Sequence, residues 1–254
     1  MQNAIFVYRT KDIQKGLILI FVLVKKQFPF VTLLCRNKIT MKDLSNYRKS
    51  YEKSELLENQ IPEDPINLFH KWFYEAEELN AAEEVNAMTV TTIGLDGFPK
   101  ARVVLLKKFN EEGFIFYTNY NSEKGKAILN NPHICLSFFW PTVERQIIIK
   151  GIAEKTADVI SDNYFASRPD GSKLGAIVSP QSEVIPNREF LENNLKALEK
   201  EWEGKEILRP AHWGGFLVRP VEVEFWQGRP NRLHDRIRYQ LTNEYDWKID
   251  RLSP

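Results

Sequence analysis

The stretch that decides the fold is residues 87–118, AMTVTTIGLDGFPKARVVLLKKFNEEGFIFYT. Its Thr- and Val-rich beginning and its two later apolar runs predict three strands, at residues 87–94, 100–109 and 114–118. Asp96-Gly97, between the first two, is the strongest short hairpin signal. A second Gly-containing turn precedes the third strand, so the stretch predicts an antiparallel meander.

Further short strands and a few helices flank this meander. The other predicted strands are residues 134–139, 145–153, 215–219, 221–227, 235–241 and 247–252. Asp64-Pro65 predicts a helix start, because a cap residue precedes a proline at the first helical position. Apolar spacing after it predicts a core-facing helix, and further helices are expected at residues 123–129 (capped by Ser122), 157–167 and 187–202. This composition predicts an α+β protein, mainly antiparallel β, folded as a closed or split barrel with peripheral helices, since closure removes exposed strand edges.

Residues 1–40 differ from the rest of the chain in their pattern of apolar and charged residues. The apolar run at residues 17–24 is shorter than the ~20 residues that a membrane-spanning helix needs. Lys25 and Lys26 follow it, where a secretory signal would have small residues before a cleavage site. We interpret residues 1–40 as an N-terminal extension outside the fold and residues 41–254 as a single domain. A membrane or organelle address is the alternative for the extension.

The composition is that of an ordinary globular protein, with 43% hydrophobic and 27% charged residues. A formal net charge of +1 gives no bulk field for nucleic acid or for an anionic membrane, so any phosphate binding must come from local clusters. Cys35 and Cys135 are too few for a disulfide framework, which predicts a reducing, cytoplasmic location, and we expect Cys135 to be a small core residue. Neither the cysteines nor the four histidines show metal-ligand spacing, so no metal is expected.

The first candidate site lies in residues 224–236, EFWQGRPNRLHDR. After a predicted turn, Arg232, His234 and Arg236 fall at every second position. If the chain is extended there, all three project to one face and repel one another unless an anion lies between them. Trp226 adds a flat apolar surface on which a ring could stack. The alternative is a solvated basic edge strand.

A second cluster surrounds the predicted meander. Arg102 and Lys107 bracket an apolar strand, where a regular strand would direct them to opposite faces, so a shared site requires a bulge or contacts beyond the strand end. Tyr117-Thr118 and Lys124 lie around the N-terminus of the helix predicted at 123–129. The free N–H groups at such an end can bind a phosphate. The alternative is an ordinary capped helix with a surface lysine.

Tyr164 and Arg168 are four residues apart and share a helical face, and Ser172 follows beyond a turn. A phenol, a guanidinium and a hydroxyl can hold a second phosphate, although a helix C-terminus also favours an arginine. Residues 44–57 are expected to be an amphipathic helix on which Arg48 and Tyr51 share a face, with a mobile arm as the alternative. No Gly-x-Gly-x-x-Gly, Walker-type loop or nucleophile elbow is present, which argues against a dinucleotide enzyme, a P-loop enzyme and a hydrolase.

Together these segments resemble the pyridoxamine 5′-phosphate oxidase family over residues 41–254. The motifs that carry the resemblance are RVVLLK (102–107), YTN (117–119), ERQ (144–146), YFASRP (164–169), FWQG (225–228), RLHDR (232–236) and WKIDRLSP (247–254). The resemblance implies a split-barrel homodimer with FMN in a cleft between subunits. It also implies oxidation of pyridoxamine 5′-phosphate and pyridoxine 5′-phosphate to pyridoxal 5′-phosphate, with O2 as acceptor, H2O2 as product and NH3 released from the amine. No nucleic-acid or membrane partner is implied.

The resemblance assigns roles residue by residue. The FMN-contacting positions it implies are Arg102, Val103, Val104, Leu105, Leu106, Lys107, Tyr117, Thr118, Lys124, Gln146, Gln181, Ser182, Trp226 and Arg236. The substrate-binding positions it implies are Arg48, Tyr51, Lys107, Tyr164, Arg168, Ser172, Arg232, Leu233 and His234, with Arg232 and His234 as the catalytic pair over the pyridine. Glu123 departs from the family pattern, because some members place an arginine there against the FMN phosphate.

Two other functions compete with an oxidase of this kind. One is a related split-barrel flavoprotein with a different substrate, which would not need the second phosphate site at Tyr164, Arg168 and Ser172. The other is a carrier that binds FMN or pyridoxal phosphate without turnover.

Overall fold

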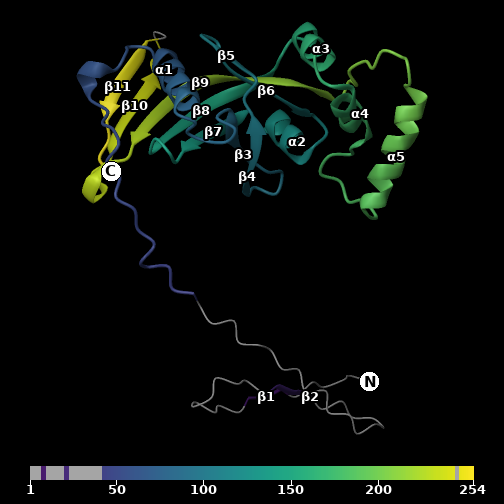
Figure 1. Cartoon of the computed structure of the whole chain (residues 1–254), viewed down its shortest axis with the longest axis horizontal. Coiled ribbons are helices and arrows are strands. Elements are labelled where there is room, and N and C mark those ends of the chain that lie inside the picture. Colours follow the sequence, from purple (N-terminus) through teal and green to yellow (C-terminus); the bar gives the residue numbers. More distant parts are fainter. Residues whose placement is uncertain (1–6, 10–19, 23–41, 244–245) are drawn as a thin grey trace. The chain divides into compact units, whose positions relative to one another are not determined.

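The computed structural model describes residues 7–9, 20–22, 42–243 and 246–254 (Figure 1). The chain divides into two units, residues 1–49 and residues 50–254. The first contains a short antiparallel pair, β1 (Val7–Arg9) and β2 (Ile20–Val22). Most of the predicted N-terminal extension, including Cys35, lies outside the described residues, so its role stays a prediction.

Residues 50–254 are organised around an antiparallel sheet that curls into an open barrel. The strands are β3 (Ala87–Ile93), β4 (Pro99–Leu105), β5 (Lys108–Asn110), β6 (Gly113–Asn119), β7 (His133–Trp140), β8 (Arg145–Lys155), β9 (Trp213–Gln227), β10 (Asp235–Leu241) and β11 (Trp247–Arg251). Each neighbour pairs antiparallel in the order β4, β3, β7, β8, β9, β6, β5, and β5 follows β4 after only two residues. The first half of β9 pairs with β6 and its second half with β10, so the sheet branches at β9 and the barrel is split. The predicted α+β split barrel is confirmed.

The middle strand of the predicted meander is not continuous. It breaks at Leu106 and Lys107, where the chain changes its hydrogen-bonding partner. The Leu106 N–H donates to the Asn86 carbonyl at 2.8 Å, on the β3 side, and the Lys107 N–H donates to the Ile115 carbonyl at 2.9 Å, on the β6 side. The third strand therefore pairs with β5 and β9. Both predicted hairpins form, but the prediction of one continuous middle strand is wrong. The break also ends the alternation that would force Arg102 and Lys107 onto opposite faces.

The predicted helices form where their caps indicate. Asp64 caps α1 (Pro65–Glu78) by accepting the Ile66 N–H at 2.7 Å, and α1 buries its expected apolar face in the barrel. Ser122 caps α2 (Glu123–Asn130) by accepting the Gly125 N–H at 3.2 Å. Three more helices, α3 (Asp158–Ala166), α4 (Asp170–Val178) and α5 (Arg188–Glu201), gather at one end of the sheet in Figure 1. Of these, α4 was not predicted.

Several local expectations were wrong. Residues 42–57 contain no helix in the structure, and the N–H groups of Glu52, Lys53 and Leu56 donate to carboxylates of the barrel instead of to helical carbonyls. Cys135 is half-buried, on the outer face of β7. Its neighbours Ile134 and Leu136 point to the other face and are buried in the core. The strands predicted on either side of Pro220 are one strand, since Pro220 lies opposite a bulge between Lys150 and Gly151, where its missing N–H is tolerated. None of the described helices combines the length and apolarity needed to cross a bilayer.

Candidate active site

Three residues predicted from distant parts of the chain converge at the N-terminal end of α2. The Lys124 ammonium donates to Thr118 Oγ1 at 3.3 Å and to Gln181 Oε1 at 3.1 Å. Thr118 Oγ1 also donates to Gln181 Oε1 at 3.3 Å, across 63 residues of sequence. Strand β6, helix α2 and the segment after α4 thus each supply one polar group to this cluster.

Positive charge dominates around Lys124. The pKa of Lys124 lies below its ordinary value, first because the side chain is buried and then because Arg102 is close, while Glu123 opposes the shift. Burial also lowers the pKa of Arg102, which donates to Thr92 Oγ1 and to the Lys100 carbonyl, both at 2.7 Å. Two partly desolvated cations beside a helix N-terminus would be stabilised by a bound anion.

Glu123, the departure from the family pattern, has a cationic partner. The Lys100 ammonium lies 2.5 Å from Glu123 Oε2. Three cations (Lys100, Arg102 and Lys124) and one carboxylate leave this cluster with a net charge of 3 − 1 = +2. That charge complements a phosphate monoester, which carries about −1.5 to −2 at neutral pH.

Two residues predicted to hold a second phosphate, Arg168 and Ser172, lie around one cavity. Arg168 and Ser172 line a cavity of about 320 Å3 together with Gln181 and Trp213. The Arg168 guanidinium lies 4.7 Å from the centre of the Trp213 ring, and burial lowers its pKa while Tyr164 opposes the shift. Arg168 Nη1 is buried and has no hydrogen-bond partner among the described residues. A buried donor of this kind is satisfied by an anion in the cavity.

Stacked aromatic rings form one side of this second site. The ring centre of Tyr117 lies 3.9 Å from that of Tyr164 and 5.5 Å from that of Trp213. The corresponding interplanar angles are 15° and 9°. Trp213 was missed by the sequence interpretation, which began this strand two residues later. Its only sequence signal was an aromatic residue before Gly214-Gly215.

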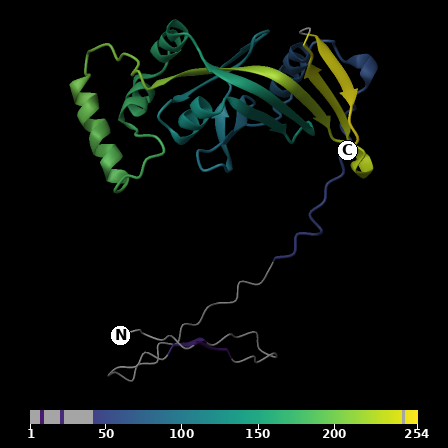
Figure 2. The ribbon, with the colours of Figure 1, turned by 180° about the vertical axis from the view of Figure 1, so that it is seen from behind.

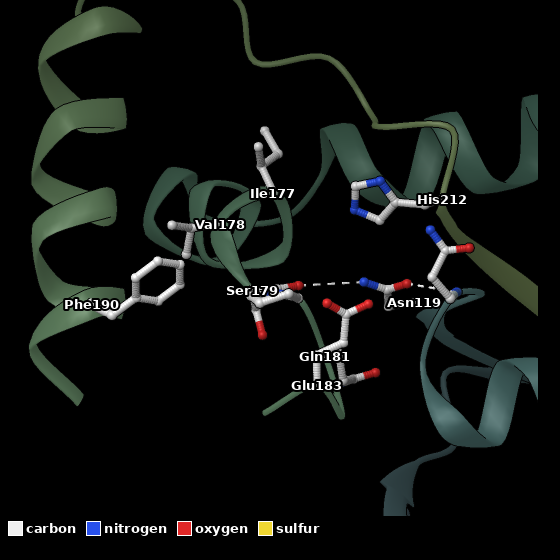
Figure 3. A pocket seen from close by; sticks show the side chains of 10 residues that line it. Asn119, Ile177, Val178, Ser179, Gln181, Glu183, Phe190 and His212 are labelled. Carbon is white, nitrogen blue, oxygen red and sulfur yellow. Dashed lines mark hydrogen bonds between the residues drawn. The ribbon is translucent and has the colours of Figure 1, made fainter. Parts of the chain in front are cut away.

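Gln181 belongs to both sites and to a neighbouring pocket of about 340 Å3 (Figure 3). Figure 3 shows the Asn119 amide pointing toward Ser179, whose carbonyl it contacts at 3.5 Å. Ser182, next in the chain, has a φ of 76°. The segment after α4 therefore contributes Gln181 to the Lys124 cluster, to the cavity beside Arg168 and to this pocket.

A third cluster lies at the other end of β9. Trp226 contacts His234, with ring centres 4.6 Å apart, and Tyr51 packs on both rings at 5.7 Å. His234 Nδ1 accepts the Arg229 N–H at 3.0 Å, so a neutral His234 carries its proton on Nε2. The pKa of His234 is lowered by burial and by Arg232, and Asp235 opposes the shift.

The prediction that Arg232, His234 and Arg236 share one extended face is wrong. Pro230–Arg232 forms a short 3-10 turn in which Asn231 and Arg232 have φ values of 56° and 63°, and β10 begins only at Asp235. Proline fixes φ before the turn, and asparagine tolerates the left-handed conformation after it. The alternation of an extended strand therefore does not apply there.

Arg236 is neutralised within its own chain. Its guanidinium forms a bidentate pair with Glu224, at 2.8 and 3.0 Å, and donates to the Ser253 carbonyl at 2.8 Å. Gln146 and Arg236 flank Trp226 in the β8–β9–β10 register, so these three predicted FMN positions belong to the third cluster. Leu233 is exposed beside it, and Arg48, which donates to the Ser45 carbonyl, lies in the N-terminal unit.

The predicted site residues therefore form two groups at opposite ends of β9. Trp213, with Arg168, begins the strand, and Trp226, with His234, ends it. At about 3.3 Å per residue, the 15 residues of β9 span on the order of 45 Å. Figure 2 shows β9 crossing between α4 and α5 at one side and β10 and β11 at the other. One chain does not bring Arg168 and Arg232 to the same pocket.

This architecture defines the class of protein, a split barrel, and comparison with known proteins gives the family. Residues 75–200 match the family model described as pyridoxamine 5′-phosphate oxidase, and residues 213–254 match the pyridoxine 5′-phosphate oxidase C-terminal dimerisation region. The pyridoxine/pyridoxamine 5′-phosphate oxidase of Flavobacterium johnsoniae is 75% identical over 213 residues, covering 84% of this chain and 100% of the relative. That of Flavobacterium psychrophilum is 72% identical over 214 residues, with coverage of 84% and 100%. The chain belongs to the pyridoxine/pyridoxamine 5′-phosphate oxidase family and is an oxidoreductase of the FMN-dependent class.

Solved structures agree with the fold. PhzG from Burkholderia lata 383, in complex with tetrahydrophenazine-1-carboxylic acid, superposes with a TM-score of 0.73 at 28% identity, covering 78% of this chain and 98% of PhzG. A pyridoxamine 5′-phosphate oxidase-related, FMN-binding protein from Nostoc punctiforme superposes with a TM-score of 0.62 at 15% identity, covering 76% and 100%. The second likeness bears on the fold alone.

Proposed function

We propose that this protein oxidises pyridoxamine 5′-phosphate and pyridoxine 5′-phosphate to pyridoxal 5′-phosphate with FMN as cofactor. Oxygen would be the final acceptor, giving H2O2, and the amine substrate would also release NH3. The observation that carries the proposal is the pair of cationic sites at Lys124 and Arg168, joined by Gln181. A cofactor and a substrate that each carry a phosphate need two such sites side by side. The names of the close relatives support the same substrates.

The residues around Lys124 fit the phosphate of FMN. Lys124 and Arg102 supply partly desolvated cations, and Thr118 and Gln181 supply polar side chains between them and the second site. When bound, FMN supplies the hydride acceptor, and the protein supplies binding and orientation.

Arg168 and Ser172 would hold the phosphate of the substrate. The unsatisfied Arg168 Nη1 gains an acceptor there, and the Trp213 ring beneath the guanidinium keeps that group directed into the cavity. By resemblance, Lys107 and Tyr164 join this site. Fixing the phosphate fixes the pyridine ring relative to the flavin, which converts binding into orientation.

Completion of the site requires a second copy of the chain. A twofold dimer places the same surface of each subunit against its partner, so the Trp226 end of one chain can meet the Arg168 end of the other. The match of residues 213–254 to a dimerisation region supports this homodimer. Each of the two active sites would then take Arg232 and His234 from the partner of the subunit that supplies Arg168.

His234 and Arg232 would orient the pyridine ring and exclude water from it. With Nδ1 accepting the Arg229 N–H, neutral His234 presents Nε2–H as a donor, and Arg232 presents a permanent charge.

An oxygen-electrode assay tests the proposed function directly. The protein, loaded with FMN, should consume oxygen and release H2O2 on addition of either phosphorylated substrate, and Arg232→Ala should lower turnover far more than FMN content. The unphosphorylated vitamers serve as a control, because they cannot occupy the Arg168 site. A protein that neither binds FMN nor consumes oxygen with these substrates contradicts the proposal.

A further inference from the structure

Residues 51–56 lie against the turn that follows β9, and two carboxylates of the barrel hold their backbone. Glu144 is only 1% exposed, and its Oε2 accepts the N–H groups of Glu52 and Lys53 at 2.9 and 3.1 Å. Asp235 Oδ2 accepts the N–H of Leu56 at 3.1 Å. A buried carboxylate is stable only when hydrogen-bonded, so these contacts fix the carboxylates and the segment together.

Glu144 is itself held at the end of β9. Its backbone carbonyl accepts the Gly228 N–H at 2.8 Å and Gln227 Nε2–H at 3.2 Å. Its φ of 60° is left-handed, a conformation that a residue other than glycine keeps only where its surroundings impose it. The carboxylate is thus aimed at residues 52 and 53 by a strained and well-bonded backbone.

Tyr51 immediately precedes the two bonded N–H groups, and its ring packs against Trp226 and His234. A Cβ atom added at Gly228 would lie 2.8 Å from Tyr51 Cβ and 3.1 Å from Glu144 Cβ, so this glycine admits both side chains. The position of Tyr51 over the His234 ring therefore depends on the backbone contacts of Glu144.

We infer that Glu144 is a positioning residue, which acts through Tyr51 on the affinity for substrate. The inference rests on the proposed function, because that function places His234 at the pyridine ring of the substrate and Tyr51 packs against His234. Glu144 reaches Tyr51 through the backbone of residues 52 and 53, so its loss should affect substrate binding and leave FMN in place.

The first experiment compares three variants of the full-length protein loaded with FMN. Glu144→Ala should raise KM for pyridoxamine 5′-phosphate about tenfold with kcat changed less than about twofold, because it removes two charge-assisted hydrogen bonds outside the reacting groups. Glu144→Gln keeps a carbonyl oxygen and should restore KM to within about threefold of the wild-type value. Glu52→Gln, the matched control, removes a carboxylate from the same segment but keeps its N–H, and should leave KM unchanged.

A double-mutant cycle separates this role from general stabilisation. If Glu144 acts through Tyr51, adding Glu144→Ala to Tyr51→Ala should change KM by less than about twofold. Full additivity of the two effects, or a loss of bound FMN in Glu144→Ala that Glu144→Gln does not restore, would overturn the inference.

Hydrogen exchange tests the contact without any turnover. In Glu144→Ala the amides of Glu52 and Lys53 should exchange more than about tenfold faster than in the wild type. Unchanged exchange, or faster exchange with an unchanged KM, overturns the inference while the oxidase activity stands. A wild-type protein with protected amides but no turnover counts against the proposed function instead.

Discussion

At Arg168, burial and an aromatic contact leave a guanidinium whose Nη1 donor finds no acceptor among the described residues. We expect Arg168→Ala to weaken binding of pyridoxamine 5′-phosphate by about 1.5–3 kcal/mol, the range for a hydrogen bond to a charged group. Steady-state kinetics would show this as a higher KM. Arg188→Ala, which removes an exposed arginine paired with Glu192, is the control and should leave KM unchanged. An unaltered KM in Arg168→Ala would remove the assigned phosphate site.

Glu123 lowers the net positive charge of the cluster formed by Lys100, Arg102 and Lys124. Neutralising Glu123 should therefore strengthen the binding of FMN. We expect Glu123→Gln to raise FMN affinity about two- to fivefold, because Lys100 is freed and repulsion of the phosphate is removed. Titration of the apoprotein, followed by flavin fluorescence, measures the change. The gain should shrink at high salt, since Glu123 is partly exposed and its charge is screened. A gain independent of salt, or a loss of affinity, contradicts this role.

The lowered pKa of Lys124 predicts a pH dependence of FMN binding. The phosphate binds the ammonium form, which a lysine with a lowered pKa loses at a lower pH than an ordinary lysine. FMN affinity should therefore fall as the pH rises through the lowered pKa of Lys124, at a lower pH than for an ordinary lysine. Lys124→Arg keeps its charge throughout this range and should flatten the profile. Equal profiles for the two proteins would show that Lys124 is not the titrating group.

At the scale of elements, α2 brings its N-terminus to the first site because Gly125 allows close contact. A Cβ atom at Gly125 would lie 2.3 Å from the Tyr120 carbonyl oxygen, whereas one at Gly171 in α4 would meet nothing within 4 Å. Gly125→Ala should lower the free energy of unfolding by about 1–3 kcal/mol through overpacking and should also weaken FMN binding. Gly171→Ala should be neutral or stabilising by up to about 1 kcal/mol. Urea denaturation of both variants compares them, and equal stabilities would contradict the close contact.

The elements that sequence predicted well are those with local signals. Asp64 and Ser122 cap α1 and α2 as expected, and Asp96-Gly97 turns the β3–β4 hairpin with Gly97 at a φ of 81°. Helix α4 was missed because Pro169 was interpreted as the end of a helix, whereas it is the residue before the next one. A proline stops one helix and can start another, and the sequence nearby does not distinguish the two roles.

At the scale of the whole molecule, the separation of Arg168 and Arg232 along β9 predicts subunit complementation. Arg168→Ala and Arg232→Ala homodimers should each be nearly inactive. Subunits unfolded together and refolded should recover about a quarter of wild-type activity, because half of the dimers are hybrids and each hybrid holds one intact site of two. Separately refolded variants, mixed afterwards without exchange, are the control. No recovery in refolded hybrids would contradict an active site shared between subunits.

The amino-acid sequence by itself determined most of the strands, the capped helices and those parts of the proposed phosphate sites that lie close together in the chain, such as Tyr164 and Arg168. These depend on turn chemistry, caps and periodicity, which act over a few residues. Only the tertiary structure decided that the strand after Leu105 changes partner, that Gln181 joins Lys124, and that Glu144 holds residues 52 and 53. Contacts between residues far apart in sequence depend on sheet register and on the packing of the whole barrel, for which no short stretch carries the signal.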